Sequence, residues 1–180
     1  MAAGRRAALP GGVEPDVETR ITADDHDALR VWLRLLATTT LIERRVRRQL
    51  QERFQTTLPR FDLMSQLYRV PAGLRMIELS RRMMVTGGNV TGITDMLERD
   101  GLVRRTEDPR DRRASRVRLT PLGRRAFRVM ADQHEAWIVQ AFADVGPGEL
   151  RDLAQLLARV KAAVRAAAAR AGGPGAPREA

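Results

Sequence analysis

Residues 97–123 read LERDGLVRRTEDPRDRRASRVRLTPLG, and this stretch decides the fold of the chain. Gly101 suits the left-handed position just after a helix end. Apolar and arginine residues then tend to alternate over 102–106 and over 115–119, the pattern of half-buried strands. The polar segment 108–114 separates the two runs and contains a proline. The sequence therefore predicts a β-hairpin with a charged, basic tip.

Helices are predicted on both sides of the hairpin. Downstream, Thr120-Pro121 combines a favoured N-cap with a proline at the first helical position, so a helix should run to about Phe142. Gly146-Pro147 opens the last helix. Upstream, we expect a long helix from Thr22 to near Phe54. Three shorter helices follow it. The first begins near Pro59, the second covers about 75–83, and the third ends at Asp100-Gly101.

The last upstream helix contains the unusual stretch VTGGNVTGIT, residues 85–94, with three glycines. A glycine costs about 0.8–1.0 kcal/mol relative to alanine in a helix interior, so some function should offset this cost. One explanation is a phosphate-binding loop of the type G-x-x-x-x-G-K-[ST]. Ile93 stands where that motif needs lysine, and 79–84 favours a helix rather than the required strand. The alternative is a helix whose backbone closely approaches a large partner.

Positive charge is concentrated around the hairpin. The chain carries a formal net charge of +10, and residues 99–128 hold eleven arginines against four acids, a net +7. An arginine-rich but merely soluble surface would spread its charge more evenly. Helix, tight turn, helix and basic hairpin is the order of a winged helix-turn-helix, which places one helix in the DNA major groove and the hairpin near the minor groove or backbone. We therefore expect salt-dependent binding to double-stranded DNA.

Composition excludes several other classes of function. The absence of cysteine rules out disulfides and thiol chemistry, and His26 and His134 have no zinc-ligand spacing. Serines lie outside any G-x-S-x-G motif, so we expect no enzyme, metal or cofactor. No apolar run reaches the roughly 18 residues of a membrane span, and the N-terminus lacks a signal-peptide pattern, so we expect a cytoplasmic protein without a membrane partner.

Three motifs give the chain a family resemblance over roughly residues 27–171. They are LERDGLVRR at 97–105, DPRDRR at 108–113 and LTPLG at 119–123. In this order the chain resembles the MarR family of bacterial transcription regulators, whose pattern is L-x-x-x-G-L-[VI]-x-R, D-P-x-D-R-R and L-T-x-x-G. The resemblance implies a homodimer that binds a pseudo-palindromic operator, with terminal helices at the dimer interface. It also implies that Arg113 reaches the minor groove and that Asp111 supports the wing arginine.

The expected DNA contacts come from the glycine-bearing helix and the wing. Asn89 could read adenine bidentately and Thr91 could touch a thymine methyl or a phosphate. Helix capping is the alternative role for Asn89, but Thr86 is better placed as the N-cap. The full predicted DNA-binding set is Thr86, Gly87, Gly88, Asn89, Thr91, Gly92, Arg110, Arg112 and Arg113.

The fold class expected is therefore mainly α with a small β-hairpin wing, in which long helices form a dimerisation domain. The domains predicted are a disordered arm at 1–20, a helical dimerisation region at 21–57 and 121–171, a winged helix-turn-helix at 58–120, and a disordered tail at 172–180. An apolar seam on the last helix favours an intersubunit interface, with packing on its own domain as the alternative. It comprises Leu150, Leu153, Leu157, Val160 and Val164.

The family resemblance also suggests an effector pocket between the long helices and the winged domain. Aromatic side chains would stack on a flat ligand and an arginine would pair with a carboxylate, so a small anionic aromatic effector is expected. Core packing is the alternative for each apolar member. The candidates are Trp32, Phe61, Asp62, Met64, Tyr68 and Arg69.

The function expected is a homodimeric, ligand-responsive repressor. An architectural or accessory DNA-binding protein with no effector is the alternative.

Overall fold

The computed structural model describes residues 27–108 and 111–171. Within them lie six helices and three strands, which form two compact units divided between Ala131 and Asp132. The predicted arm at 1–20, the helix start at Thr22 and the tail at 172–180 lie outside the described residues. The elements are α1 (Asp27–Phe54), α2 (Leu58–Tyr68), β1 (Leu74–Arg75), α3 (Met76–Met83), α4 (Gly87–Arg99), β2 (Val103–Asp108), β3 (Asp111–Leu119), α5 (Pro121–Ala141) and α6 (Pro147–Ala171).

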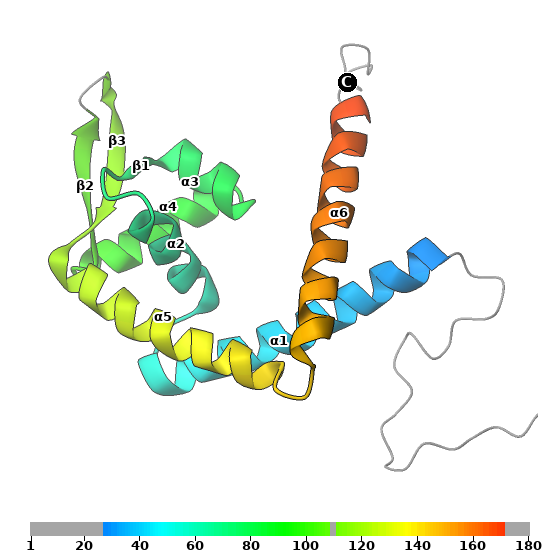
Figure 1. Ribbon diagram of the computed structural model, residues 1–180. Helices are drawn as coiled ribbons and strands as arrows, with labels where there is room; N and C mark the ends of the chain where they lie inside the picture. The colour runs from blue at the N-terminus through cyan, green and yellow to red at the C-terminus, as the bar shows by residue number, and fades with distance from the viewer. Residues whose placement is uncertain (1–26, 109–110, 172–180) are drawn as a thin grey trace, which may run out of the picture. The chain divides into compact units, whose positions relative to one another are not determined.

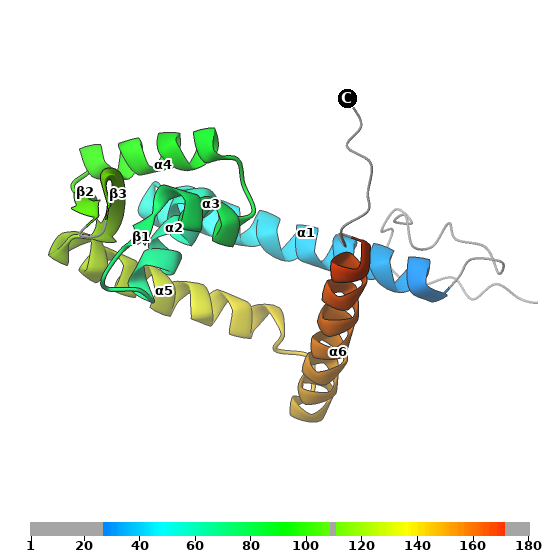
Figure 2. The same ribbon diagram turned by 90° about the horizontal axis from the view of Figure 1, so that it is seen from above.

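The first unit is built around α2. This helix packs against α3, α4 and β3, and Figures 1 and 2 show these elements gathered around it. The apolar side chains of this unit are buried because helices α2 to α4 and the sheet enclose them from different directions. The buried core includes Leu63, Met64, Leu67, Leu74, Leu79, Val90, Leu97, Val103 and Val117. The prediction of a mainly α fold with a small β wing is confirmed.

The sheet differs from the predicted two-stranded hairpin. A third strand, β1, pairs antiparallel with β3, which gives the order β1-β3-β2. Leu74 lies opposite Val117, and Arg75 lies opposite Arg116. Arg75 was expected in the following helix, but it belongs to β1 and caps α3 instead. A strand of two residues leaves no alternation in the sequence, so only its pairing with β3 reveals it.

The motifs at the hairpin base are explained by backbone contacts. Gly101 has a φ of +70° and ends α4, as predicted. Thr120 caps α5, because its Oγ1 accepts a hydrogen bond from the backbone N–H of Gly123 at 3.0 Å and donates one to the carbonyl of Gly101 at 2.7 Å. A Cβ on Gly123 would lie 1.9 Å from the carbonyl oxygen of Leu102, so only glycine lets α5 approach this close. The motif L-T-x-x-G therefore joins the wing to α5.

The second unit contains the end of α5 and all of α6. Helix α6 is solvent-exposed along its length from Arg151 to Arg170, and its apolar side chains are exposed with the rest. Leu153, Leu157 and Val160 keep about 40% of their surface exposed. Among the helices of residues 27–108 and 111–171, none is long and apolar enough to span a membrane.

Candidate nucleic-acid interface

Helix α4 has one buried side and one open side. The buried side chains are Val90, Thr94 and Leu97, all fully buried. The hydroxyl of Thr94 donates to the carbonyl of Val90 at 2.7 Å, which satisfies it inside the core. The i, i+3, i+7 spacing of Val90, Ile93 and Leu97 predicts that all three face the core. Ile93 is only half-buried, however, because the buried stripe passes through Thr94 instead.

The open side carries the predicted contact residues of the helix. Thr86, Gly87, Gly88, Asn89, Thr91 and Gly92 are all exposed. Thr86 holds the N-cap position with φ −66° and ψ 153°, yet its side chain makes no capping hydrogen bond. Its hydroxyl therefore lies at the helix N-terminus, where exposed backbone N–H groups and the helix dipole favour a phosphate.

The glycines of α4 are not required by the fold. A Cβ added to Gly87, Gly88 or Gly92 would meet nothing within 4 Å. Their backbone is also helical rather than left-handed, since the positive-φ glycines of the described chain are Gly73 and Gly101. The cost of glycine in a helix is thus not offset by packing inside the protein. The bare helix surface at these positions faces solvent.

The remaining polar groups of α4 divide into free and occupied ones. The hydroxyl of Thr91 donates to the carbonyl of Gly87 at 3.0 Å, which leaves its methyl group and its acceptor capacity for a partner. Asp95 pairs with the guanidinium of Arg105 in β2, which also pairs with Glu98. Partial burial alone would lower the pKa of Arg105, but the hydrogen bonds and charges of the two acids raise it. Asp95 therefore orients an arginine and joins α4 to the wing instead of repelling a phosphate.

The base of the wing is held by a buried carboxylate. The Asp108 side chain is 0% exposed, and its Oδ2 accepts from Nε of Arg75 at 2.6 Å and from Nε of Arg116 at 2.8 Å. Nη1 of Arg116 also donates to the carbonyl of Gly73 at 3.0 Å. These bonds tie β1 and β3 to the end of β2. Sequence reasoning missed this support, although the match to the first acid of D-P-x-D-R-R could have indicated it.

The wing tip itself is not described. Arg110 lies outside the described residues, and the side chains of Asp111, Arg112 and Arg113 lie outside them as well. Their predicted roles in wing support and minor-groove contact therefore stay predictions. The backbone pairing that leads to the tip is described, with Asp108 opposite Asp111 and an irregular register beside it.

Further exposed groups near α4 were not in the predicted set. Arg81 and Arg82 are exposed in the last turn of α3, just before the turn into α4. Met84 occupies the turn with a φ of 54° and is 91% exposed. The doubled arginine beside the glycines, RRMMVTGG, was the signal that could have identified this basic flank.

The predicted effector residues divide between core and surface. Phe61 and Met64 are buried, and the ring of Phe61 lies 5.3 Å from that of Phe127 in α5. The ring of Tyr68 is tilted against the Phe127 ring, with 4.9 Å between their centres, and the guanidinium of Arg124 lies 4.9 Å from the centre of the Tyr68 ring. The aromatic cluster between α2 and α5 occupies one face each of Phe61 and Tyr68, which favours the core-packing alternative for these two residues.

The other three candidates do not join this cluster. Trp32 is 57% exposed on α1, and Arg69 is exposed after α2. Asp62 is half-buried. Burial raises the pKa of its carboxyl, and the negative charge of Glu43 raises it further, whereas the positive charge of Arg47 acts to lower it.

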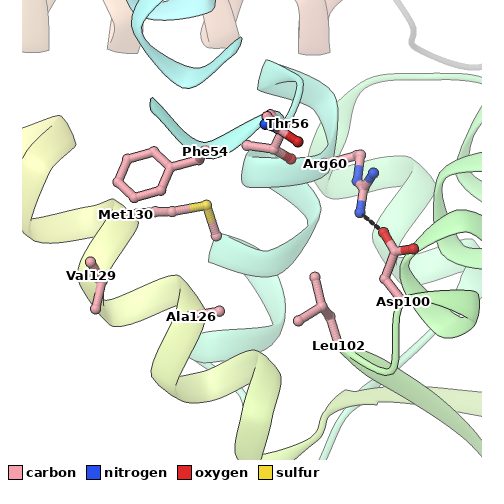
Figure 3. A pocket seen from close by; sticks show the side chains of 9 residues that line it. Phe54, Thr56, Arg60, Asp100, Leu102, Ala126, Val129 and Met130 are labelled. Carbon is pink, nitrogen blue, oxygen red and sulfur yellow. Dashed lines mark hydrogen bonds and ion pairs between the residues drawn. The ribbon is translucent and has the colours of Figure 1, made fainter. Parts of the chain in front are cut away.

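A different set of residues lines a cavity of about 510 Å³ in the first unit. Its walls come from the end of α1, the start of α2, the segment that leaves α4, and α5 (Figure 3). None of the six predicted effector residues lines it. The role of these six residues in effector binding stays a prediction, and the cavity adds a second candidate site beside the buried Phe61 and Met64. No group of three or more His, Asp or Glu side chains able to hold a metal occurs in the described part of the chain.

Comparisons with known proteins agree with this geometry. The MarR family model matches residues 56–115, from the start of α2 into the wing. YkoM, an uncharacterized HTH-type transcriptional regulator of Bacillus subtilis, is 32% identical over 83 residues, or 46% of this chain and 54% of YkoM. The chain thus spans about half the length, or less, of the first curated relatives that it matches.

Two solved structures from Streptomyces coelicolor resemble the chain over most of its length. The MarR-family regulator AbsC shares the fold with a TM-score of 0.69 at 24% identity, covering 81% of this chain and 99% of AbsC. Sco3205, a MarR-family regulator solved in complex with DNA, gives a TM-score of 0.65 at 28% identity, covering 73% of this chain and 83% of Sco3205.

Proposed function

Because the chain belongs to the MarR family of transcriptional regulators, we propose that this protein is a homodimeric repressor that leaves a pseudo-palindromic operator when a small anionic effector binds. One observation carries the DNA-binding part. The open side of α4 combines a helix N-terminus with three glycines that the fold does not need, next to a basic hairpin. The DNA complex of the related Sco3205 supports the same assignment.

In this proposal α4 enters the major groove with its bare surface toward the base edges. Asn89 reads an adenine, and the methyl group of Thr91 contacts the methyl group of a thymine. Thr86 and the N–H groups of Gly87 and Gly88 bind a phosphate at the helix N-terminus. On the wing, Arg113 reaches the minor groove, with Arg110 and Arg112 beside it and Asp111 as support.

The homodimer part is supported by the exposure of α6. Its apolar seam, from Leu150 to Val164, repeats at three- and four-residue steps, and four of its five members are exposed in the single chain. An apolar stripe of this kind on a long helix is typical of a coiled-coil-like interface. A dimer would place two recognition helices on half-sites about one helical turn apart, roughly 10 bp centre to centre.

The test begins with the selection of genomic fragments by the purified protein, followed by footprinting and fluorescence anisotropy at several salt concentrations. We expect an imperfect inverted repeat, and affinity that falls steeply with salt. Asn89→Ala and Arg113→Ala should each weaken operator binding about tenfold or more, within the range of 1–3 kcal/mol expected for a specific contact. The matched control Arg159→Ala, on α6, should leave operator affinity unchanged.

Three results would contradict the proposal. Binding without sequence preference would favour an architectural protein, and a single unpaired half-site would remove the dimer. Operator affinity that is unchanged in both Asn89→Ala and Arg113→Ala would remove α4 and the wing from recognition.

A further inference from the structure

We propose that the cavity beside α2 binds a small monocarboxylic acid with an apolar body, and that the ligand's carboxylate replaces Asp100 as the partner of Arg60. This inference rests on the proposed function, because it names the effector class of that regulator and the residues that detect it. The predicted effector was anionic, but none of the residues predicted to hold it lines this cavity.

Arg60 supplies the anion-binding group. It lies in the first turn of α2, lines the cavity, and pairs through Nη2 with Oδ2 of Asp100 (Figure 3). Its Nε is buried and has no hydrogen-bond partner in the part of the chain that the structure describes. A buried donor without a partner is costly, and a guanidinium binds a carboxylate best through two parallel N–H groups. Nε and Nη2 lie on the same edge of the guanidinium, so a two-point carboxylate there displaces Asp100.

Asp100 is a replaceable partner. It is the C-cap of α4, where the helix dipole disfavours a negative charge, and 48% of its side chain is exposed. Water can therefore solvate the carboxylate as soon as it leaves Arg60. The cavity also borders the N-terminus of α2, where the dipole favours an anion. The dipole of α2 thus favours an anion in the cavity, while the dipole of α4 weakens the hold of Asp100 on Arg60.

The rest of the cavity selects an apolar body. Phe54, Leu102, Ala126, Val129 and Met130 form its walls, with Thr56 and Gln55 as the neutral polar members. Arg60 is the one cation and Asp100 the one acid among the lining residues. A volume of about 510 Å³ lies within the usual range for small-molecule sites. A ligand with one carboxylate and a compact apolar group fits this lining, whereas a second charge would have no partner.

The exchange has a direct route to the DNA-binding face. The pair Arg60–Asp100 connects the start of α2 to the C-terminus of α4, and Leu102 leads from there into β2. A ligand that takes Arg60 releases the end of α4 while it contacts Leu102. It thereby favours a different position of α4 relative to the wing, and DNA affinity falls because the ligand and the operator prefer different states.

The experiment uses the full chain and three probe acids, benzoate, phenylacetate and hexanoate, each compared with its neutral amide by isothermal titration calorimetry. We expect at least one acid to bind, and its amide to bind at least tenfold more weakly. Arg60→Gln should weaken the acid at least tenfold, whereas Asp100→Asn should tighten it three- to tenfold by removal of the competing carboxylate. The control Arg48→Gln, the same change at an exposed position of α1 outside the lining, should bind the acid as the wild type does.

The inference is overturned if no acid binds, if acid and amide bind equally, or if Arg60→Gln binds the acid as the wild type does. Should Arg60→Gln fail to fold by circular dichroism, Asp100→Asn decides, and unchanged or weaker acid binding overturns the exchange. Operator binding without any ligand is measured in parallel. DNA binding with no acid binding refutes this inference alone, whereas acid binding by a protein that binds no DNA refutes the proposed function alone.

Discussion

Replacement of Gly92 by alanine separates the needs of the fold from the needs of DNA binding. Gly92 lies in the middle of α4, and a Cβ there would meet nothing within 4 Å of the protein. Alanine should therefore gain the full helix propensity difference, about 0.8–1.0 kcal/mol in the free energy of unfolding. For a chain of this size a gain of this magnitude corresponds to a Tm increase of roughly 2–4 °C.

The same methyl group should harm operator binding. If the bare surface at Gly92 lies against the DNA, a Cβ must push α4 away from the groove and lengthen its other contacts. We expect Gly92→Ala to weaken operator affinity at least tenfold, a loss of about 1.4 kcal/mol in binding free energy. Thermal unfolding and fluorescence anisotropy with labelled operator measure the two effects on the same preparation.

A matched control is available in α6. Gly148 lies in the first turn of that helix, and a Cβ there would meet only the end of the Arg151 side chain at 4.0 Å. Gly148→Ala should therefore leave stability unchanged or higher, and leave operator affinity unchanged. Undiminished DNA binding in Gly92→Ala, or a loss of its stability, would refute the explanation of the glycines.

The remaining predictions concern a buried charge, a pH dependence and the dimer. Asp108→Asn should lower the free energy of unfolding by about 3–5 kcal/mol, because it leaves two arginines without their buried counter-ion. The control Glu107→Gln, at the exposed neighbouring position, should change the free energy of unfolding little. Equal urea midpoints for the two variants would contradict this prediction. Since burial raises the pKa of Asp62, its ionised form opposes folding at neutral pH, so Asp62→Asn should raise the Tm at pH 7, with an advantage that shrinks toward pH 3.8. A Tm advantage of Asp62→Asn that grows as the pH falls would show that folding lowers the pKa of Asp62 instead of raising it. Leu157→Glu should halve the mass measured by light scattering and leave the helical content intact, and a persistent dimer would move the interface away from α6.

The sequence was sufficient wherever one residue type acts on its own backbone neighbourhood. Gly101 and Thr120 predicted the helix boundaries correctly, because left-handed φ angles and N-caps are local requirements. The alternation on both sides of the wing predicted β2 and β3 for the same reason. The spacing of these signals was also enough to identify the winged helix-turn-helix and the family.

Only the tertiary structure decided which charges meet. Arg75 and Asp108 are separated by 33 residues, and Arg60 and Asp100 by 40, so no local pattern distinguishes these arginines from the many others in the chain. The cavity was missed in the same way, because its lining comes from four separate segments and depends on which side of α2 the aromatic cluster fills. Neighbouring residues determine local backbone conformation, whereas ion pairs and cavities depend on distances in space that are fixed only when the chain packs.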